Sequence, residues 1–212
     1  MSSLIFATDE SQILVATDTL AVTPDGEPFC FASKATHVPH LRTIIAGTGG
    51  GGLSNEWALT VSARMIVRGI RNLNYHTPIG LRDLWETYRQ RYSLDQDLTT
   101  TVYQFGISEE DNKVVSFAYR STNNFESEQL PYGTGVKPEC NVPEGNLIEV
   151  IPSMMHEQRS REASKPAEAR LYIGGEIFAH YLTKDECRCF SLGEFEGFEA
   201  NQRRIFENYD KG

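Results

Sequence analysis

The chain has 212 residues and a formal net charge of −9 at pH 7. This length suits one domain with a substantial core, so residues 1–212 are expected to fold as a single domain. The acidic charge and the lack of a basic cluster argue against a nucleic-acid partner. No stretch approaches the roughly 18 consecutive apolar residues of a membrane span. Because the N-terminus also lacks the pattern of a signal peptide, we expect a cytoplasmic protein that does not contact membranes.

The N-terminal third predicts two hairpins and a buried strand. β-rich runs at residues 3–8 and 13–18 flank a polar tetrapeptide, which is typical of a hairpin. A second polar turn, at residues 23–28, precedes another β-rich segment. The apolar residues 42–47 then predict a buried strand that leads into a glycine-rich run.

After the glycines the hydrophobic period becomes that of helices. A first helix, capped by Ser54, is predicted from the four-residue spacing of Trp57, Val61 and Met65. A second helix is expected to begin near Pro78, because proline is favoured in the first turn of a helix.

The C-terminal half predicts strands with two further helical segments. The patterns in residues 99–120 and 171–192 each predict a hairpin, and residues 196–208 are predicted to form a terminal helix. Pro152 and Pro166 confine any helix near them to the segment between the two prolines. This order of elements predicts an α+β protein with helices stacked on antiparallel sheets.

The two N-terminal hairpins are expected to bring three chemically useful residues together. Folding the first hairpin between residues 10 and 11 places residue 2 opposite 19, so that Asp18 lies beside Ser2. Folding the second hairpin near residue 25 brings Asp18 opposite residue 33 or 34, where Lys34 stands.

Such a cluster can activate a hydroxyl group. After removal of Met1, the α-amine of Ser2 would titrate at about 7.7–8.0 and could act as a base. The Lys34 ammonium would favour the deprotonated forms of the amine and the hydroxyl, and Asp18 would orient Lys34. The alternative is a cross-strand Asp–Lys pair on the surface, beside a frayed chain end.

The glycine run allows two functional interpretations. Gly47, Gly49 and Gly52 match the G-x-G-x-x-G pattern of dinucleotide-binding proteins, so a nucleotide-binding enzyme using Gly47–Gly52 is one alternative. However, no acidic residue ends a strand about 20 residues later, where Asn72 stands, and the lysine of a P-loop is missing. A backbone N–H in this run could instead stabilise an oxyanion.

With these residues in place, the chain resembles proteasome β-subunits and bacterial HslV-like proteases, which are N-terminal-nucleophile (Ntn) hydrolases. The resemblance implies a four-layer αββα sandwich and a peptidase or other amidohydrolase activity. It implies that Ser2 takes the place of the family's nucleophilic threonine, and that Asp18 and Lys34 occupy the family positions. Gly50 would then supply the oxyanion hole, and Thr134 in "YGTG" would supply a further hydroxyl near the site.

The resemblance also implies ligands and partners. No organic cofactor is needed, but the backbone carbonyls of Gly175, Phe178 and Tyr181 would hold a structural sodium ion. Peptides or proteins would be the substrates. Subunits of this family form closed homo-oligomeric rings, and an ATPase that unfolds substrates would be a further partner.

Two departures from the family pattern leave an alternative open. The nucleophile is serine rather than threonine. The family's Asp and Ser, which support the terminal amine just before a late Gly-Gly pair, are replaced here by Arg170 and Ile173. The chain could therefore be a catalytically inactive subunit with a scaffold role.

Overall fold

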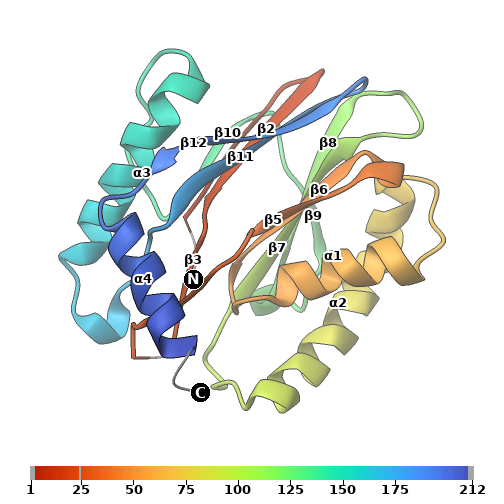
Figure 1. Cartoon of the computed structure of the whole chain (residues 1–212). Coiled ribbons are helices and arrows are strands. Elements are labelled where there is room, and N and C mark those ends of the chain that lie inside the picture. Colours follow the sequence, from red (N-terminus) through yellow and green to blue (C-terminus); the bar gives the residue numbers. More distant parts are fainter. Residues whose placement is uncertain (1–2, 24, 210–212) are drawn as a thin grey trace.

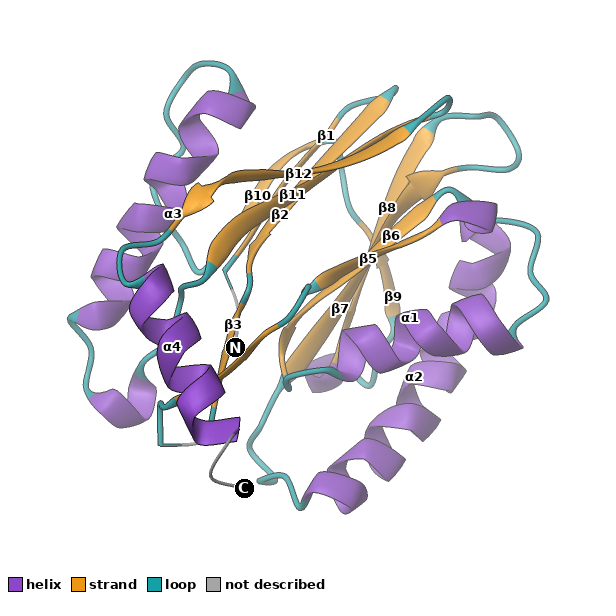
Figure 2. Ribbon diagram, viewed as in Figure 1, coloured by secondary structure: helices purple, strands orange, loops and turns teal. Residues whose placement is uncertain are grey.

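Strands dominate the computed structural model, which describes residues 3–23 and 25–209. Two large sheets have the strand orders β10-β1-β2-β11-β12 and β5-β6-β7-β8-β9, a small sheet pairs β3 with β4, and all pairs are antiparallel (Figure 2). The strands are β1 (Leu4–Thr8), β2 (Gln12–Asp18), β3 (Leu20–Val22), β4 (Pro28–Phe31), β5 (Ala35–Val38), β6 (Thr43–Gly49), β7 (Thr100–Ile107), β8 (Val114–Arg120), β9 (Ser127–Gln129), β10 (Gly133–Lys137), β11 (Glu176–Thr183) and β12 (Cys187–Glu194). The helices are α1 (Leu53–Arg64), α2 (Ile70–Tyr92), α3 (Leu147–Ala163) and α4 (Phe198–Tyr209), with single 3₁₀ turns η1 (Pro39–Leu41), η2 (Ser121–Asn123) and η3 (Ala167–Ala169).

The two large sheets share one apolar core. Leu4 and Val15 from the first sheet pack with Ile44 and Phe105 from the second. Because alternate residues of a strand point to opposite faces, Ile5 lies on the other face of β1, in a separate core with α3. Both faces of β1 and β2 are therefore buried, which explains why residues 13–18 are apolar almost throughout.

Each helix covers a different part of these sheets (Figure 1). Trp57 of α1 and Trp85 of α2 belong to the core on the outer face of the β5–β9 sheet. Met154 and Met155 of α3 pack on the opposite sheet. Helix α4 instead lies against β4, where Phe198 stacks on Phe31 with 4.8 Å between the ring centres.

The expected four-layer αββα sandwich of the α+β class is wrong for this chain. The described residues form a mixed α/β fold, rich in sheet, with four helices and three antiparallel sheets. At Thr19 the chain leaves the first sheet, and β3 pairs only with β4. Helix α4 packs on this small sheet and has no buried residue, so it does not complete a helical layer.

The predicted hairpins are confirmed, and two helix predictions are wrong in their boundaries. Helix α2 begins at Ile70 and continues through Pro78, and α3 begins at Leu147 and continues through Pro152. In both helices, buried residues before the proline add packing energy that outweighs one missing hydrogen bond. The N-cap of α1 is Gly52, with φ +89°, rather than Ser54. None of the helices in the described part of the chain is long and apolar enough to cross a bilayer.

Candidate functional site

A buried ion pair forms the centre of the candidate site. Lys34 Nζ lies 2.8 Å from Asp18 Oδ1, and the Asp18 side chain is fully buried while that of Lys34 is 12% exposed. Lys34 Nζ also donates a hydrogen bond to the Leu20 carbonyl at 2.7 Å. The predicted contact between Asp18 and Lys34 is therefore confirmed. The alternative of an exposed surface pair is wrong, because both side chains are largely buried.

Asp18 connects this lysine to the start of β1. The Ser3 N–H donates to Asp18 Oδ1 at 2.9 Å, and the Gly174 N–H donates to Oδ2 at 3.2 Å. The Asp18 N–H in turn donates to the Ser3 carbonyl, as the predicted register requires. Ser2, the predicted nucleophile, lies outside the described residues, so the structure places its neighbour Ser3 and not Ser2 itself.

Gln158 of α3 is a site residue that the sequence reasoning missed. The Ser3 hydroxyl donates to Gln158 Oε1, and Gln158 Nε2 donates to the Pro138 carbonyl. Gln158 is fully buried, and these bonds tie the start of β1 to α3 and to the end of β10. Nothing in the local sequence marks Gln158, because its partners are 20 and 155 residues away.

The glycine run lies next to Lys34. The Gly47 N–H donates to the Lys34 carbonyl at 3.3 Å, and Gly49 and Gly52 adopt positive φ angles. Gly50 is buried, and a Cβ there would come within 3.0 Å of Trp85. Among the described residues, none accepts a hydrogen bond from the Gly50 N–H, so this donor is available for another group.

The structure disfavours the nucleotide interpretation of Gly47–Gly52. A dinucleotide fingerprint belongs to a βαβ unit in a parallel sheet. Here β6, which leads into the glycines, pairs with β5 and β7, and both pairings are antiparallel. The hydroxyl of Tyr88 also donates to the Gly51 carbonyl, which ties the run to α2.

Thr134 is not brought to the ion pair. It lies opposite Ala7 in the pairing of β1 with β10. Four residues of strand, or about 13 Å, separate this position from the level of Ser3. The predicted hydroxyl near the site is therefore not supplied by Thr134.

Lys137 lies at the end of β10, beside the start of β1. It pairs with Leu4 and donates from Nζ to Thr101 Oγ1 at 3.3 Å. Burial lowers the pKa of Lys137, and the nearby Arg120 charge lowers it further. Lys137 thus adds a second amine near the end of β1 that carries the ion pair. Sequence reasoning missed it because the register of β10 was unknown.

The three carbonyls proposed for sodium do not converge. Phe178 and Tyr181 are three residues apart in β11, and hence about 10 Å apart along the strand. The Gly175 carbonyl accepts a hydrogen bond from the Phe195 N–H at 2.9 Å. Oxygen atoms that bind one cation lie within about 5 Å of one another. These three carbonyls therefore do not surround a single ion in this structure.

The positions that differ from the family pattern have structural contacts. Arg170 donates from its guanidinium to the carbonyls of Ala163 and Lys165. Ile173 is buried in the core beneath α3. The carboxylate and hydroxyl that would support a terminal amine are therefore absent from these two positions. Arg170 binds backbone carbonyls instead, and Ile173 is an apolar core residue.

Compared with known proteins, the chain matches no family model and no curated protein.

Proposed function

We propose that the chain is an N-terminal-nucleophile amide-bond hydrolase that acts in the cytoplasm on peptide or protein substrates. The observation that carries this proposal is the buried Asp18–Lys34 pair, hydrogen-bonded to the backbone of Ser3. Ser3 directly follows the proposed nucleophile, so the pair acts on the first residue of the processed chain. A buried ion pair seldom adds stability by itself, which favours a functional role for Asp18 and Lys34.

In this mechanism Ser2 becomes the first residue after removal of Met1. Its hydroxyl oxygen attacks the substrate carbonyl carbon while its α-amine takes the hydroxyl proton. The Lys34 charge favours the resulting alkoxide, and Asp18 holds Lys34 in position. The Gly50 N–H donates to the tetrahedral oxyanion.

The intermediate then collapses in two stages. The carbon–nitrogen bond breaks, and the leaving amine takes the proton held by the α-amine, which leaves an ester on Ser2. Water, deprotonated by the same amine, attacks this ester, releases the acid and restores the hydroxyl of Ser2. No cofactor enters this sequence of steps.

A second candidate is a catalytically inactive subunit with a scaffold role. Arg170 and Ile173 favour it, because neither supplies the carboxylate or hydroxyl that would support a terminal amine. The two candidates differ in whether Ser2 can be acylated.

The test is to treat the purified protein with a peptide β-lactone, which acylates nucleophilic hydroxyl groups, and to measure intact mass. We expect loss of Met1 and one adduct, located by tandem mass spectrometry on Ser2. Ser2→Ala should abolish the adduct, whereas the exposed Ser11→Ala should retain it. Lys34→Ala should slow adduct formation by at least 10²-fold, since the hydroxyl is then poorly activated. Retention of Met1, or equal labelling of Ser2→Ala, would exclude the mechanism and favour the scaffold role.

A further inference from the structure

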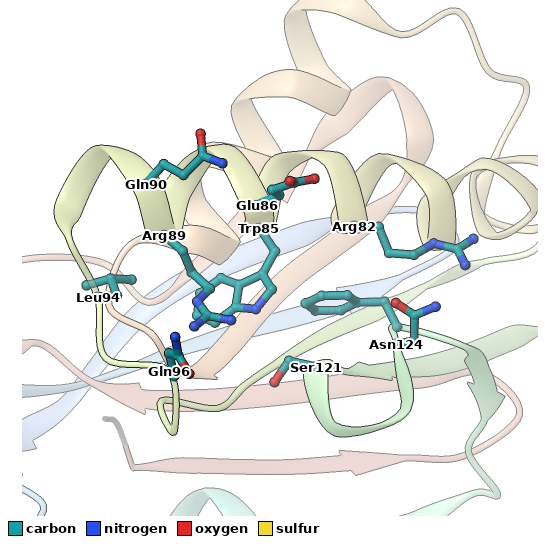
Figure 3. A pocket seen from close by; sticks show the side chains of 10 residues that line it. Arg82, Trp85, Glu86, Arg89, Gln90, Leu94, Gln96, Ser121 and Asn124 are labelled. Carbon is teal, nitrogen blue, oxygen red and sulfur yellow. The ribbon is translucent and has the colours of Figure 1, made fainter.

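A cavity of about 590 Å³ lies between the outer side of α2 and the η2 loop. Figure 3 shows the side chains of α2 pointing across it toward that loop. The helix contributes Arg82, Trp85 and Arg89, and the loop contributes Ser121, Asn124 and Phe125. The volume lies within the range of small-molecule sites.

Two guanidinium groups and one carboxylate, that of Glu86, line this cavity. Arg82 and Arg89 are seven residues apart, so they project from the same side of α2, about 10 Å apart along its axis. Neither forms an ion pair with a carboxylate in residues 3–23 or 25–209. With Arg82 and Arg89 against Glu86, the lining carries a net charge of +1 in a chain whose net charge is −9, which favours an anionic ligand.

The two ends of the cavity differ in chemistry. At one end the Arg89 guanidinium lies 5.8 Å from the centre of the Trp85 ring and covers it. Since Trp85 is only 9% exposed, the flat surface at this end is that of the Arg89 guanidinium. At the other end Arg82 donates from Nε to the Pro78 carbonyl at 3.1 Å, which fixes its orientation and leaves its terminal nitrogens free. Figure 3 places Arg89 above Trp85 and Arg82 at the opposite end of the row.

The remaining polar groups can form hydrogen bonds with the edge of a planar molecule. Gln96 brings an amide to the end near Arg89, and Glu86 lies on α2 between the two arginines, whereas the Gln90 amide points away from Arg89 (Figure 3). Amides both donate and accept hydrogen bonds, and a carboxylate accepts from an amino group. A purely inorganic anion would leave these groups and the flat surface of the Arg89 guanidinium unused.

We propose that this cavity binds a nucleoside phosphate. The base stacks on the Arg89 guanidinium, which covers Trp85. Glu86 and Gln96 contact the edge of the base, and Arg82 binds the phosphate. Guanidinium groups both stack on planar rings and bind phosphate oxygens through paired N–H groups, so one residue type serves both ends. None of the residues that line this cavity belongs to the Gly47–Gly52 run, although Trp85 lies beside Gly50. Occupancy of the cavity does not depend on hydrolytic activity.

The test is isothermal calorimetry with ADP, adenosine and pyrophosphate, using the full chain. We expect ADP to bind, and adenosine and pyrophosphate each to bind at least tenfold more weakly, because each fills one half of the cavity. Arg82→Gln and Arg89→Gln should each weaken ADP binding about tenfold or more, with Arg68→Gln, an exposed arginine outside the cavity, as the matched control. Circular dichroism would verify that each variant is folded.

A second measurement uses Trp85 itself. The chain has two tryptophans, both buried, and of the two only Trp85 lines the cavity. ADP should therefore change tryptophan fluorescence in the native protein but not in Trp85→Phe. Absence of ADP binding at millimolar concentration, binding that both arginine variants retain, or equal affinity for pyrophosphate and ADP would each overturn the proposal.

Discussion

His180 is a single residue whose burial should make the fold sensitive to acid. It is 4% exposed in the core between the sheets, and its Nδ1 has no hydrogen-bond partner in the described residues. Burial, and then the charge of His37, lowers the pKa of His180 to about 4 from its ordinary value of 6.5. The neutral form is therefore the one that the folded protein accommodates.

The sign of the effect follows from proton binding. Below pH 6.5 the unfolded chain protonates His180, whereas the folded protein does so only near pH 4. Stability from this residue is complete above pH 6.5 and is lost as the pH falls to 4. The loss in free energy of unfolding should be about 3 kcal/mol.

Urea unfolding at several pH values between 7.5 and 4 would measure this loss. In His180→Leu, the loss in free energy of unfolding between pH 7.5 and 4 should be about 3 kcal/mol smaller than in the native protein. Substitution of an exposed histidine, His76→Gln, should leave this loss unchanged. If native protein and His180→Leu lose equal stability on acidification, His180 is not the group responsible.

Among the helices, α2 depends on a cap from a distant residue. The Glu109 carboxylate accepts hydrogen bonds from the N–H groups of Arg71 and Asn72, at 3.1 and 2.8 Å. These N–H groups have no partner within the helix, and the negative charge also suits the helix N-terminus. Hydrogen bonds from both N–H groups lower the pKa of Glu109, although burial opposes this.

Removal of this cap should destabilise the protein. Glu109→Ala is expected to cost about 1–2 kcal/mol, the usual value of a helix cap. Glu110→Ala, at an exposed neighbouring position, should cost less than about 0.5 kcal/mol. Chemical denaturation of both variants would measure the difference, and equal costs would show that Glu109 does not cap α2.

The glycine run offers a second test at the scale of an element. A Cβ at Gly50 would press on Trp85 at 3.0 Å, whereas a Cβ at Gly51 would meet no atom within 4 Å. If the Gly50 N–H stabilises the oxyanion, Gly50→Ala should lower kcat/KM for an amide substrate by about 10²–10³-fold. Gly51→Ala should remain close to the native rate, and equal rates for the two variants would exclude Gly50 from this role.

At the scale of the whole molecule, two separate groups of apolar side chains are exposed. One lies at the α1–α2 end and the other around β4 and α4, on the opposite side of the molecule (Figure 1). The first comprises Ile66, Tyr75 and Ile79, and the second Phe29, Phe206 and Tyr209. Two different patches on opposite sides suit a head-to-tail interface, which generates a ring when the rotation between neighbouring subunits closes.

We therefore expect a homo-oligomer well above the 23.8 kDa of the single chain. Light scattering coupled to size exclusion would measure its mass. Ile79→Asp should shift the mass downward, since it places a charge in one patch, whereas a change at the exposed Lys184 should not. A native monomer at micromolar concentration would contradict the ring.

Local sequence rules were sufficient for the centre of the candidate site. The turns at residues 9–12 and 23–28 determine the register of the first strands, and this register alone brings Asp18 to Ser3 and to Lys34. Side-chain alternation makes such a prediction reliable, because a slip of one residue would expose the apolar face of each strand. The remaining hairpins and the terminal helix were predictable for the same reason.

Only the tertiary structure decided the contacts between distant segments. Gln158, Lys137 and Glu109 reach the elements that they stabilise through packing across many residues. Pro78 and Pro152 lie inside helices because buried neighbours outweigh a local preference, and α4 packs on the small β3–β4 sheet because the chain leaves the large sheet after Asp18. A sequence specifies its turns and periods locally, but burial energy depends on which surfaces meet, and that is settled only when the whole chain is folded.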